Sequence, residues 1–300
     1  LSAASTYTLS VFVKTSVLDS IQLQLGDLGF TNSVAVTYNT TTGAVESAAA
    51  VAGTWTSASS TAKQYPSGWW RFTVTATATT NAGDRVSLTC TDTGDGTNGV
   101  LLWGAQIEAA AFASTYIPTT TLAGARNADV LTYPTTGWLS ATAGTLYVEW
   151  QMFSVETSAS KWAVAIDDGT ANEMILLGMV SGSAIMNGQT TAVAGADSSV
   201  SAGSAMTANT TQKGAFGYVL NNVNLASSGS IGTTDTSVVI PTVDTLNIGM
   251  RAASSGFIFG PIRRVAYFNS RLPNADLLIL SGDAGPFYPY PGPSTTYSIA

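Results

Sequence analysis

Hydrophobic residues recur at every second position along much of the first third of the chain, and glycine-containing turns separate the runs. This period of two is that of a β-strand with one buried face, and no helical period lies between the runs. Short strands at this spacing are typical of an antiparallel β-sandwich. The predicted strands lie in the segments 7–14, 20–25, 34–38, 70–76, 86–90 and 100–103.

A second series of predicted strands follows Pro134. One of them, 174–180, is continuously apolar, which suits a strand buried on both faces. Another contains Ile262 and Val265, three positions apart, so it needs a β-bulge if both side chains point inward. The series comprises the segments 146–152, 162–166, 174–180, 216–220, 246–250 and 262–268. The predicted fold class is therefore all-β, with two antiparallel β-sandwich (jelly-roll) domains in tandem.

One short C-terminal helix is expected after the last strand. Asn274 is a suitable N-cap for the apolar run 275–280, because its short polar side chain can accept a hydrogen bond from the first turn. Pro273 precedes the run, and Gly282 supplies a stop signal after it. We expect this helix to lie against the edge of the second sandwich.

The end of the chain has a different character. Its closely spaced prolines exclude helix and sheet interior, so an extended tail is predicted. The tail displays Phe287, Tyr288 and Tyr290 as candidates for contact with other subunits. The predicted domain organisation is a first jelly roll in 1–117, a linker in 118–134, a second sandwich in 135–285 and the extended tail in 286–300.

The charge balance argues against two classes of partner. The chain has 11 lysines and arginines, a net charge of −7 and only one adjacent basic pair, Arg263 and Arg264. A nucleic-acid binder needs a basic stripe to neutralise phosphates, so no nucleic-acid partner is expected. No apolar run approaches the length of a membrane span, so no membrane partner is expected either.

The residue inventory limits the chemistry. Histidine is absent, which removes Ser-His-Asp and Cys-His catalysis and most zinc and iron sites. Cys90 is the single cysteine, so no intramolecular disulfide can form. Its alternation with Val86 and Leu88 predicts a buried thiol. The chain is predicted to be non-enzymatic, with no catalytic residue, no cofactor and no metal site.

Carboxylates are the remaining catalytic candidates. Glu149 and Glu156 lie in the segment YVEWQMFSVE, but a glycoside hydrolase needs two acids that converge on one bond. Glu149 is out of phase with the core positions of its strand, and Glu156 follows too late for the closely spaced acids of a glucanase strand. Asp92, Asp95 and the loop 167–169 offer oxygen ligands for calcium, yet the aspartates and glycines there suit turn geometry better.

Tryptophans are the candidates for glycan binding, because their flat rings can stack on the apolar faces of sugars. Trp70 is in phase with the core of its strand and is assigned to packing. Trp69 is out of phase, and Trp55 lies in a loop-like stretch, so these two are the glycan-binding candidates. Trp103 is predicted to fill the core from a central, buried strand.

The segment Leu101–Thr120 is the most distinctive in the chain, and it is predicted to close the first domain. Gln106 and Glu108 are expected to tie down loops through hydrogen bonds. The segments of the first half resemble, in their order, a carbohydrate-binding-type jelly-roll module found in tail-fibre and other virion proteins of tailed bacteriophages. They are YTLSVFVK (7–14), AVTYNTTTGAV (35–45), GWWRFTVTATAT (68–79), GDGTNGVLLWGAQIE (94–108) and STYIPTT (114–120).

The second half resembles the concanavalin/laminin-G-like sandwich that often follows this module. The matching segments are GTLYVEWQM (144–152), LNIGMRA (246–252) and GPIRRVAYFNSRLPNADLLILSG (260–282). The first module departs from its family because only six residues precede Tyr7, where the family has further strands. Either another chain completes the sheet, or a preceding segment has been lost or left out.

The resemblance implies a non-catalytic structural or adhesion protein on the virion surface, which is an extracellular location. Its expected partners are other virion subunits, with a homotrimer favoured, and host-surface glycans. A lectin-like module that binds bacterial surface glycans is the alternative function, and a polysaccharide depolymerase is a further alternative. The family's modules share no catalytic residues that could be assigned to this chain.

Overall fold

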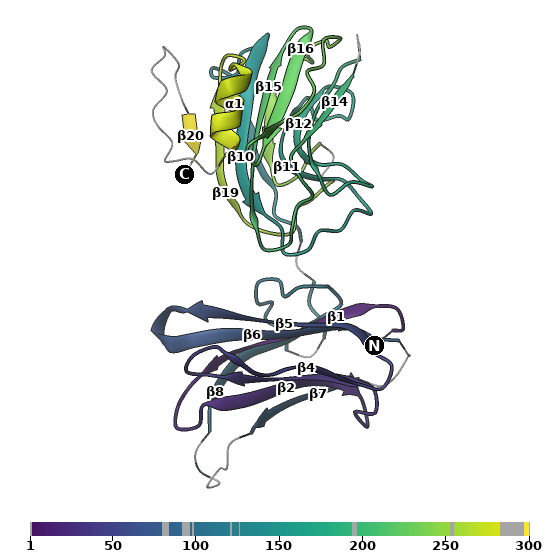
Figure 1. The fold of residues 1–300 in the computed structure, drawn as a ribbon, viewed down its shortest axis with the longest axis vertical. Coiled ribbons are helices and arrows are strands. Elements are labelled where there is room, and N and C mark those ends of the chain that lie inside the picture. The colour runs from purple at the N-terminus through teal and green to yellow at the C-terminus, as the bar shows by residue number, and fades with distance from the viewer. Residues whose placement is uncertain are drawn as a thin grey trace. The chain divides into compact units, whose positions relative to one another are not determined.

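The computed structural model describes residues 2–79, 84–91, 97, 99–120, 122–125, 127–193, 197–252, 255–282 and 297–299. The chain forms two compact units, Leu1–Arg126 and Asn127–Ala300. Both are built from antiparallel sheets, which confirms the predicted all-β class with tandem sandwiches (Figure 1).

The first unit contains two sheets of four strands each. One sheet has the order β5 (Thr56–Tyr65), β6 (Trp69–Thr77), β1 (Thr6–Lys14) and β8 (Leu101–Glu108). The other has the order β4 (Val45–Ala52), β3 (Ser33–Asn39), β2 (Ser20–Asp27) and β7 (Asp84–Cys90). A 3-10 turn, η1 (Pro66–Gly68), connects β5 to β6.

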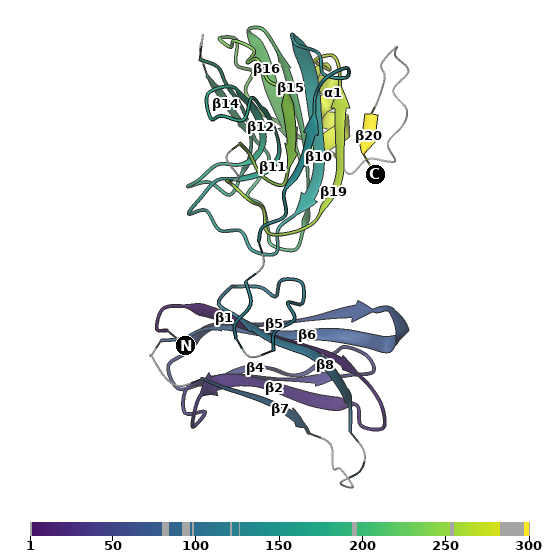
Figure 2. The same ribbon diagram turned by 180° about the vertical axis from the view of Figure 1, so that it is seen from behind.

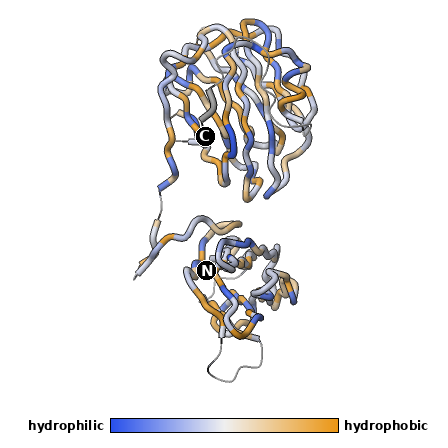
Figure 3. Tube along the Cα trace, turned by 90° about the vertical axis from the view of Figure 1, so that its left-hand side faces the viewer, coloured by the Kyte–Doolittle hydropathy of each residue, from blue (hydrophilic) through white to orange (hydrophobic). Residues whose placement is uncertain are grey.

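The core of this unit lies between the two sheets and follows the predicted alternation. Figure 3 colours the trace by the hydropathy of each residue. Tyr38 of one sheet stacks on Phe72 of the other, with ring centroids 4.3 Å apart and planes at 16°. The Tyr38 hydroxyl donates a hydrogen bond to the Thr73 carbonyl across the core. The two sheets are therefore joined by aromatic packing and by a buried polar contact.

The second unit contains two sheets of six strands each (Figure 2). The first has the order β17 (Ser230–Ile231), β16 (Asn222–Ser227), β15 (Thr211–Val219), β10 (Ala143–Gln151), β19 (Ile262–Phe268) and β20 (Tyr297–Ile299). The second has the order β14 (Ser198–Ala202), β13 (Met186–Thr191), β12 (Met174–Met179), β11 (Lys161–Asp167), β18 (Thr245–Ile248) and β9 (Leu131–Pro134).

Two sequence predictions about these strands are confirmed. Every residue of β12 is buried, as its continuous apolar run indicated. The register between β10 and β19 shifts where Glu149 pairs with Arg264 and Trp150 pairs with Ile262. This irregularity is the predicted bulge, and it lets Ile262 and Val265 both pack against the core.

The strand β9 lies within the predicted linker. Leu131 to Pro134 pair with Ile248 to Thr245 of β18, so these residues belong to a sheet of the second unit. All four are exposed, and the alternation of so short a segment gave no core signal. Backbone pairing places the strand there, and the predicted linker is shortened at its C-terminal end.

The predicted helix is present as α1 (Asn274–Ser281), with two differences. Its N-cap is Pro273, while the Asn274 Oδ1 accepts a hydrogen bond of 2.6 Å from Arg271 Nη2. It also covers a sheet face, not an edge, because Leu277 is buried among side chains of β10, β15, β16 and β19. Among the described residues, no helix is long and apolar enough to span a membrane.

Two predictions of burial in the first unit are wrong. Cys90 is exposed, and Trp103 keeps 54% of its surface exposed. Both lie on edge strands, β7 and β8, which have a neighbour on one side alone. An apolar, alternating segment on an edge strand looks in sequence like a central one, because strand order is set by pairings distant in the chain.

Candidate functional site

The outer face of the sheet β5–β6–β1–β8 gathers the aromatic residues that do not pack in the core. The strand register places outward-facing side chains side by side in rows across the sheet. One row consists of Tyr65, Trp69, Lys14 and Leu101. The next row consists of Lys63, Arg71, Phe12 and Trp103.

The rings of these rows touch one another and a loop residue. Phe12 lies 5.2 Å from Tyr65 and 5.1 Å from Trp103 between ring centroids. Trp103 in turn lies 4.7 Å from Tyr116, with planes at 50°. We name Tyr65, Trp69, Phe12, Trp103 and Tyr116 the aromatic face. Trp103 is its most open member, while Tyr65 and Trp69 are half-buried.

Two cations lie against this face. Lys63 places its Nζ 5.4 Å from the Tyr65 ring centroid, and the Arg71 guanidinium carbon lies 5.2 Å from that of Phe12. Such contacts hold the rings in place and keep positive charge beside them. Lys63 is exposed, so its charge is available to a ligand, whereas Arg71 is buried.

The remaining rows of the same sheet face are polar, and a loop segment covers part of them. Hydroxyl pairs join neighbouring strands, with Thr61 and Thr73 at 2.6 Å and Thr8 and Thr75 at 2.8 Å. The segment 110–117 lies across them, because the Ser114 carbonyl accepts a 2.5 Å hydrogen bond from Arg71 Nη1. The segment therefore covers part of the polar rows, while Trp103 and Lys63 at the aromatic end stay exposed.

The hydrogen bonds predicted for Gln106 and Glu108 are confirmed. Gln106 Oε1 accepts the Ile117 N–H at 2.7 Å. Glu108 accepts the N–H of Ser114 at 2.9 Å and its hydroxyl at 2.5 Å. Since these bonds hold the loop in which Tyr116 lies, they also position one ring of the aromatic face.

The structure separates the two predicted glycan-binding residues. Trp69 projects from the outer face, beside Tyr65 and Lys14. Trp55 is only 4% exposed and belongs to the core, so its assignment to the surface is wrong. It lies where the chain crosses from β4 to β5, and its indole fills the interior between the two sheets.

Sequence reasoning missed the other members of the aromatic face. Tyr65 ends β5, a strand that was not predicted and that has no buried residue. Phe12 lies between the core residues Val11 and Val13, so it is a large ring at a polar position of its strand. That mismatch is a signal that alternation alone could have supplied. Trp103 was assigned to the core because β8 was predicted to be central.

Glu149 and Glu156, the two acids considered for catalysis, have different surroundings. Glu149 accepts a 2.6 Å hydrogen bond from the Tyr147 hydroxyl, and its cross-strand neighbours are Lys213 and Arg264. Burial and the neighbouring carboxylate raise the pKa of Tyr147 well above its usual value. Glu156 is exposed in a separate loop.

Asp167 anchors loops within the protein. Its buried carboxylate accepts hydrogen bonds from Gly169 N at 3.0 Å, Asn247 Nδ2 at 2.7 Å and Ala252 N at 2.9 Å. Burial raises the pKa of this carboxyl. Asp168 is exposed and bonds Thr170, which closes a turn.

Within the described part of the chain, no three His, Cys, Asp or Glu residues gather as metal ligands. Two sets of predicted residues cannot be placed, because they lie outside the described residues: Asp92 and Asp95, and the tail aromatics Phe287, Tyr288 and Tyr290.

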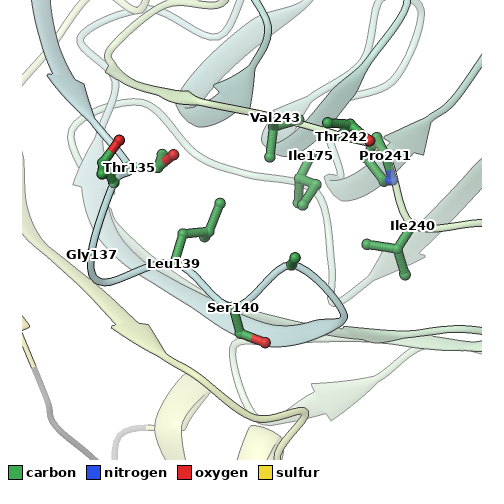
Figure 4. A pocket seen from close by; sticks show the side chains of 11 residues that line it. Thr135, Gly137, Leu139, Ser140, Ile175, Ile240, Pro241, Thr242 and Val243 are labelled. Carbon is green, nitrogen blue, oxygen red and sulfur yellow. The ribbon is translucent and has the colours of Figure 1, made fainter.

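The second unit has a hollow of about 210 Å³ between the loops 135–141 and 240–243, shown in Figure 4. Ile175 of β12 forms part of its wall, and Leu139 and Val243 add further apolar surface. Hydroxyl groups come from Thr135, Ser140 and other lining residues. None of the lining side chains is an acid, a base or a cation, so the hollow has no groups for acid–base catalysis.

No protein-family description matches this chain, and no curated protein matches it. Solved structures show a likeness of fold. The CBM40 module of Ruminococcus gnavus IT-sialidase, bound to α2,3-sialyllactose, shares 14% identity over 48% of this chain and 84% of its own, with a TM-score of 0.39.

Two further structures show the same kind of likeness. The heptameric SAP-like pentraxin of Limulus polyphemus shares 12% identity over 59% of this chain and 88% of its own, with a TM-score of 0.41. The LG1-3 region of the laminin α2 chain shares 10% identity over 92% of this chain and 64% of its own, with a TM-score of 0.38. All three structures have jelly-roll or concanavalin-like folds.

Proposed function

We propose that this chain is a non-catalytic adhesion protein whose first unit binds glycans of bacterial surfaces through its aromatic face. The observation that supports this most directly is the open Trp103 ring, packed between Phe12 and Tyr116 on the outside of a sheet. A large exposed indole held rigidly by other rings loses little conformational entropy when a ligand stacks on it.

The surroundings of the face suit a sugar chain. Stacking on Trp103 and Trp69 supplies apolar contact, and the ammonium groups of Lys14 and Lys63 supply hydrogen-bond donors beside it. No acid lies in the two aromatic rows, so the face also tolerates negatively charged sugars. The open, shallow geometry fits an internal stretch of a polysaccharide.

The binding proposal is tested on a glycan array with bacterial capsular and lipopolysaccharide fragments. The wild type is expected to bind a subset of these saturably, and Trp103→Ala and Trp69→Ala are expected to lose about tenfold or more in affinity. Trp138→Ala, which alters a ring of the second unit, is the matched control. If the wild type binds no glycan, the glycan-binding part of the proposal is wrong.

A second candidate function is a structural role in a bacteriophage virion, as a tail-fibre or other exposed appendage subunit. Its support is the ordered set of sequence segments that resemble such proteins. Mass spectrometry of purified particles, with immunogold labelling of the appendages, tests this role. Absence of the chain from particles of a phage that encodes it would remove the virion assignment and leave the glycan-binding proposal intact.

The absence of enzymatic activity is also part of the proposal. It is supported by the engagement of Glu149 with Tyr147 and by the uncharged lining of the second-unit hollow. Incubation with capsule and lipopolysaccharide, followed by a reducing-end assay, is expected to give no release above a buffer control. Release that Glu149→Gln abolishes would instead identify a depolymerase.

A further inference from the structure

Strand β8 has an unusually exposed and apolar free edge. Leu101 is 51% exposed, Leu102 47% and Ile107 42%, and the strand has a neighbour, β1, on one side alone. Its sequence LLWGAQIE contains no lysine or proline to discourage pairing with another chain. Natural proteins cover or block edges of this kind, because unpaired backbone groups and apolar side chains together favour strand addition.

A groove follows the second half of this edge. It has a volume of about 390 Å³, with the residues 105–108 of β8 on one side and residues of the segment 117–124 on the other. Ile107, Ile117 and Leu122 contribute apolar side chains to its lining, beside polar ones such as Gln106 and Thr119. In the described part of the chain, no recorded backbone hydrogen bond joins β8 to that segment. The groove is therefore a slot beside an unpaired strand edge.

A bulge in the middle of β8 controls which way its side chains face. Gly104 has a φ of +61°, and the pairing with β1 skips a residue between Ser10 and Phe12. Without the bulge, residues 101 and 108 would face opposite sides of the sheet, because side chains alternate with a period of two. With it, Leu101 and Glu108 both face outward, as their partners Lys14 and Thr8 do.

The bulge makes the strand self-complementary. Reversal of the strand about the point between Gly104 and Ala105 exchanges Leu101 with Glu108, Leu102 with Ile107 and Trp103 with Gln106. Every exchanged pair faces the same side of the sheet, as the register with β1 shows. In such a pair, residues 101–104 of one copy lie opposite residues 105–108 of the other, which border the groove.

We propose that two copies of this chain pair through β8, antiparallel about a two-fold axis between Gly104 and Ala105. In this arrangement Leu102 packs on Ile107 of the second copy. By symmetry this contact occurs twice in the interface, and it covers side chains that are exposed in the single copy. Leu101 lies beside Glu108 of the second copy, so Lys14, its neighbour on β1, comes close to that carboxylate. The apolar half-strand of each copy occupies the groove of the other.

An interface of this type is isologous and closes at two copies. It differs in this respect from the trimer that the sequence resemblance implies. It would join two four-stranded sheets into one continuous sheet and bring two aromatic faces onto the same side of it. The pairing uses backbone groups and apolar side chains of β8, so it does not depend on glycan binding.

The test compares Leu101→Glu with Leu101→Lys in the full chain. Both variants remove the same apolar side chain, and they differ in the charge placed beside Lys14 within one copy and beside Glu108 across the interface. A glutamate at position 101 is attracted to Lys14 within one copy but repelled by Glu108 across the interface, and a lysine has the opposite preferences. We expect the dimer dissociation constant of Leu101→Glu to exceed that of Leu101→Lys by about tenfold, since each interface contains the contact twice.

Mass is measured by light scattering after size-exclusion chromatography over a concentration series up to about 100 µM. The wild type is expected at twice the chain mass of 30.8 kDa, and Val51→Glu on the free edge of β4 is expected to remain dimeric. Circular dichroism verifies that each variant is folded. A monomeric or trimeric wild type, or equal dissociation constants for the two Leu101 variants, would overturn the proposal.

Discussion

The carboxylate of Glu108 accepts two hydrogen bonds from Ser114, one from its backbone N–H and one from its hydroxyl. This contact closes the segment 109–117 over the polar rows of the sheet and leaves the aromatic rows open. Glu108→Ala leaves both donors of Ser114 without this acceptor, so the segment should open more often. We expect the unfolding free energy to fall by about 1–3 kcal/mol.

Hydrogen–deuterium exchange resolved to peptides measures the local effect of this substitution. Amides of 109–117 are expected to exchange faster in Glu108→Ala, while amides of the second unit keep their rates. Glu156→Ala, which removes an exposed carboxylate, serves as the control. Unchanged exchange in 109–117 would show that the Ser114 contact does not hold the segment.

Gly43 lies directly against the Trp70 ring, with a φ of +73°. In Gly43→Ala the new methyl group would overlap this ring and also occupy a left-handed conformation. The combined cost is expected to be about 2–5 kcal/mol of unfolding free energy. Gly68→Ala is the matched control, because its φ is +77° but its nearest recorded neighbour is Lys14 Cε at 3.7 Å. The control should lose only about 1–2 kcal/mol in chemical denaturation.

Burial raises the pKa of Tyr38 from 10.0 to about 12. The folded pKa is higher than the unfolded one, so this contribution to stability is complete below pH 10 and is lost as the pH rises toward 12. Tyr38→Phe removes the titration together with the bond to Thr73. Between about pH 8 and about pH 11, the wild type should therefore lose about 1 kcal/mol more than Tyr38→Phe.

Urea denaturation of both proteins at the two pH values measures this difference. Tyr133→Phe makes the same chemical change at an exposed position and should track the wild type. A stability gap between wild type and Tyr38→Phe that stays constant with pH would contradict the assigned burial of the phenol.

The buried carboxylate of Asp167 accepts hydrogen bonds from three donors: Gly169 in the following turn, Asn247 in β18 and Ala252 after β18. Asp167→Ala leaves all three without this acceptor, and we expect a loss of about 3–5 kcal/mol in unfolding free energy. Asp168→Ala, one residue away and exposed, should cost under about 1 kcal/mol. Thermal unfolding followed by calorimetry distinguishes the two variants, and similar melting temperatures would argue against an anchoring role for Asp167.

Alternation along the chain predicted the fold class and many of the strands, but β4 and β5 have no buried residue and were missed. It identified the buried faces of β1 and β12 and the bulge near Ile262, because each depends on which side chains face a core. It could not give strand order, since order arises from pairings between segments distant in the sequence. The errors at Cys90 and Trp103 both follow from this limit.

The sequence predicted only part of the candidate site. Trp69 was found because it is out of phase with its core-facing neighbours, and the same test applied to Phe12 would have added one more ring. Tyr65 was beyond this test, because β5 has no buried residue that sets a phase. Trp55 was wrongly assigned to the surface because it lies between two strands, where no alternating pattern indicates which side chain faces the core. Its burial depends on how the chain crosses between sheets.

The short strand β9 has a mechanical consequence. It is the first strand of the second unit, and it is attached by pairing with β18 while its four side chains stay exposed. Tension along the chain from the first unit reaches β9 before it reaches the core strands. Since little apolar surface holds it, β9 should detach first and release about 13 Å of extended chain. If the chain bears load in the proposed adhesion role, this strand should yield while both cores remain folded.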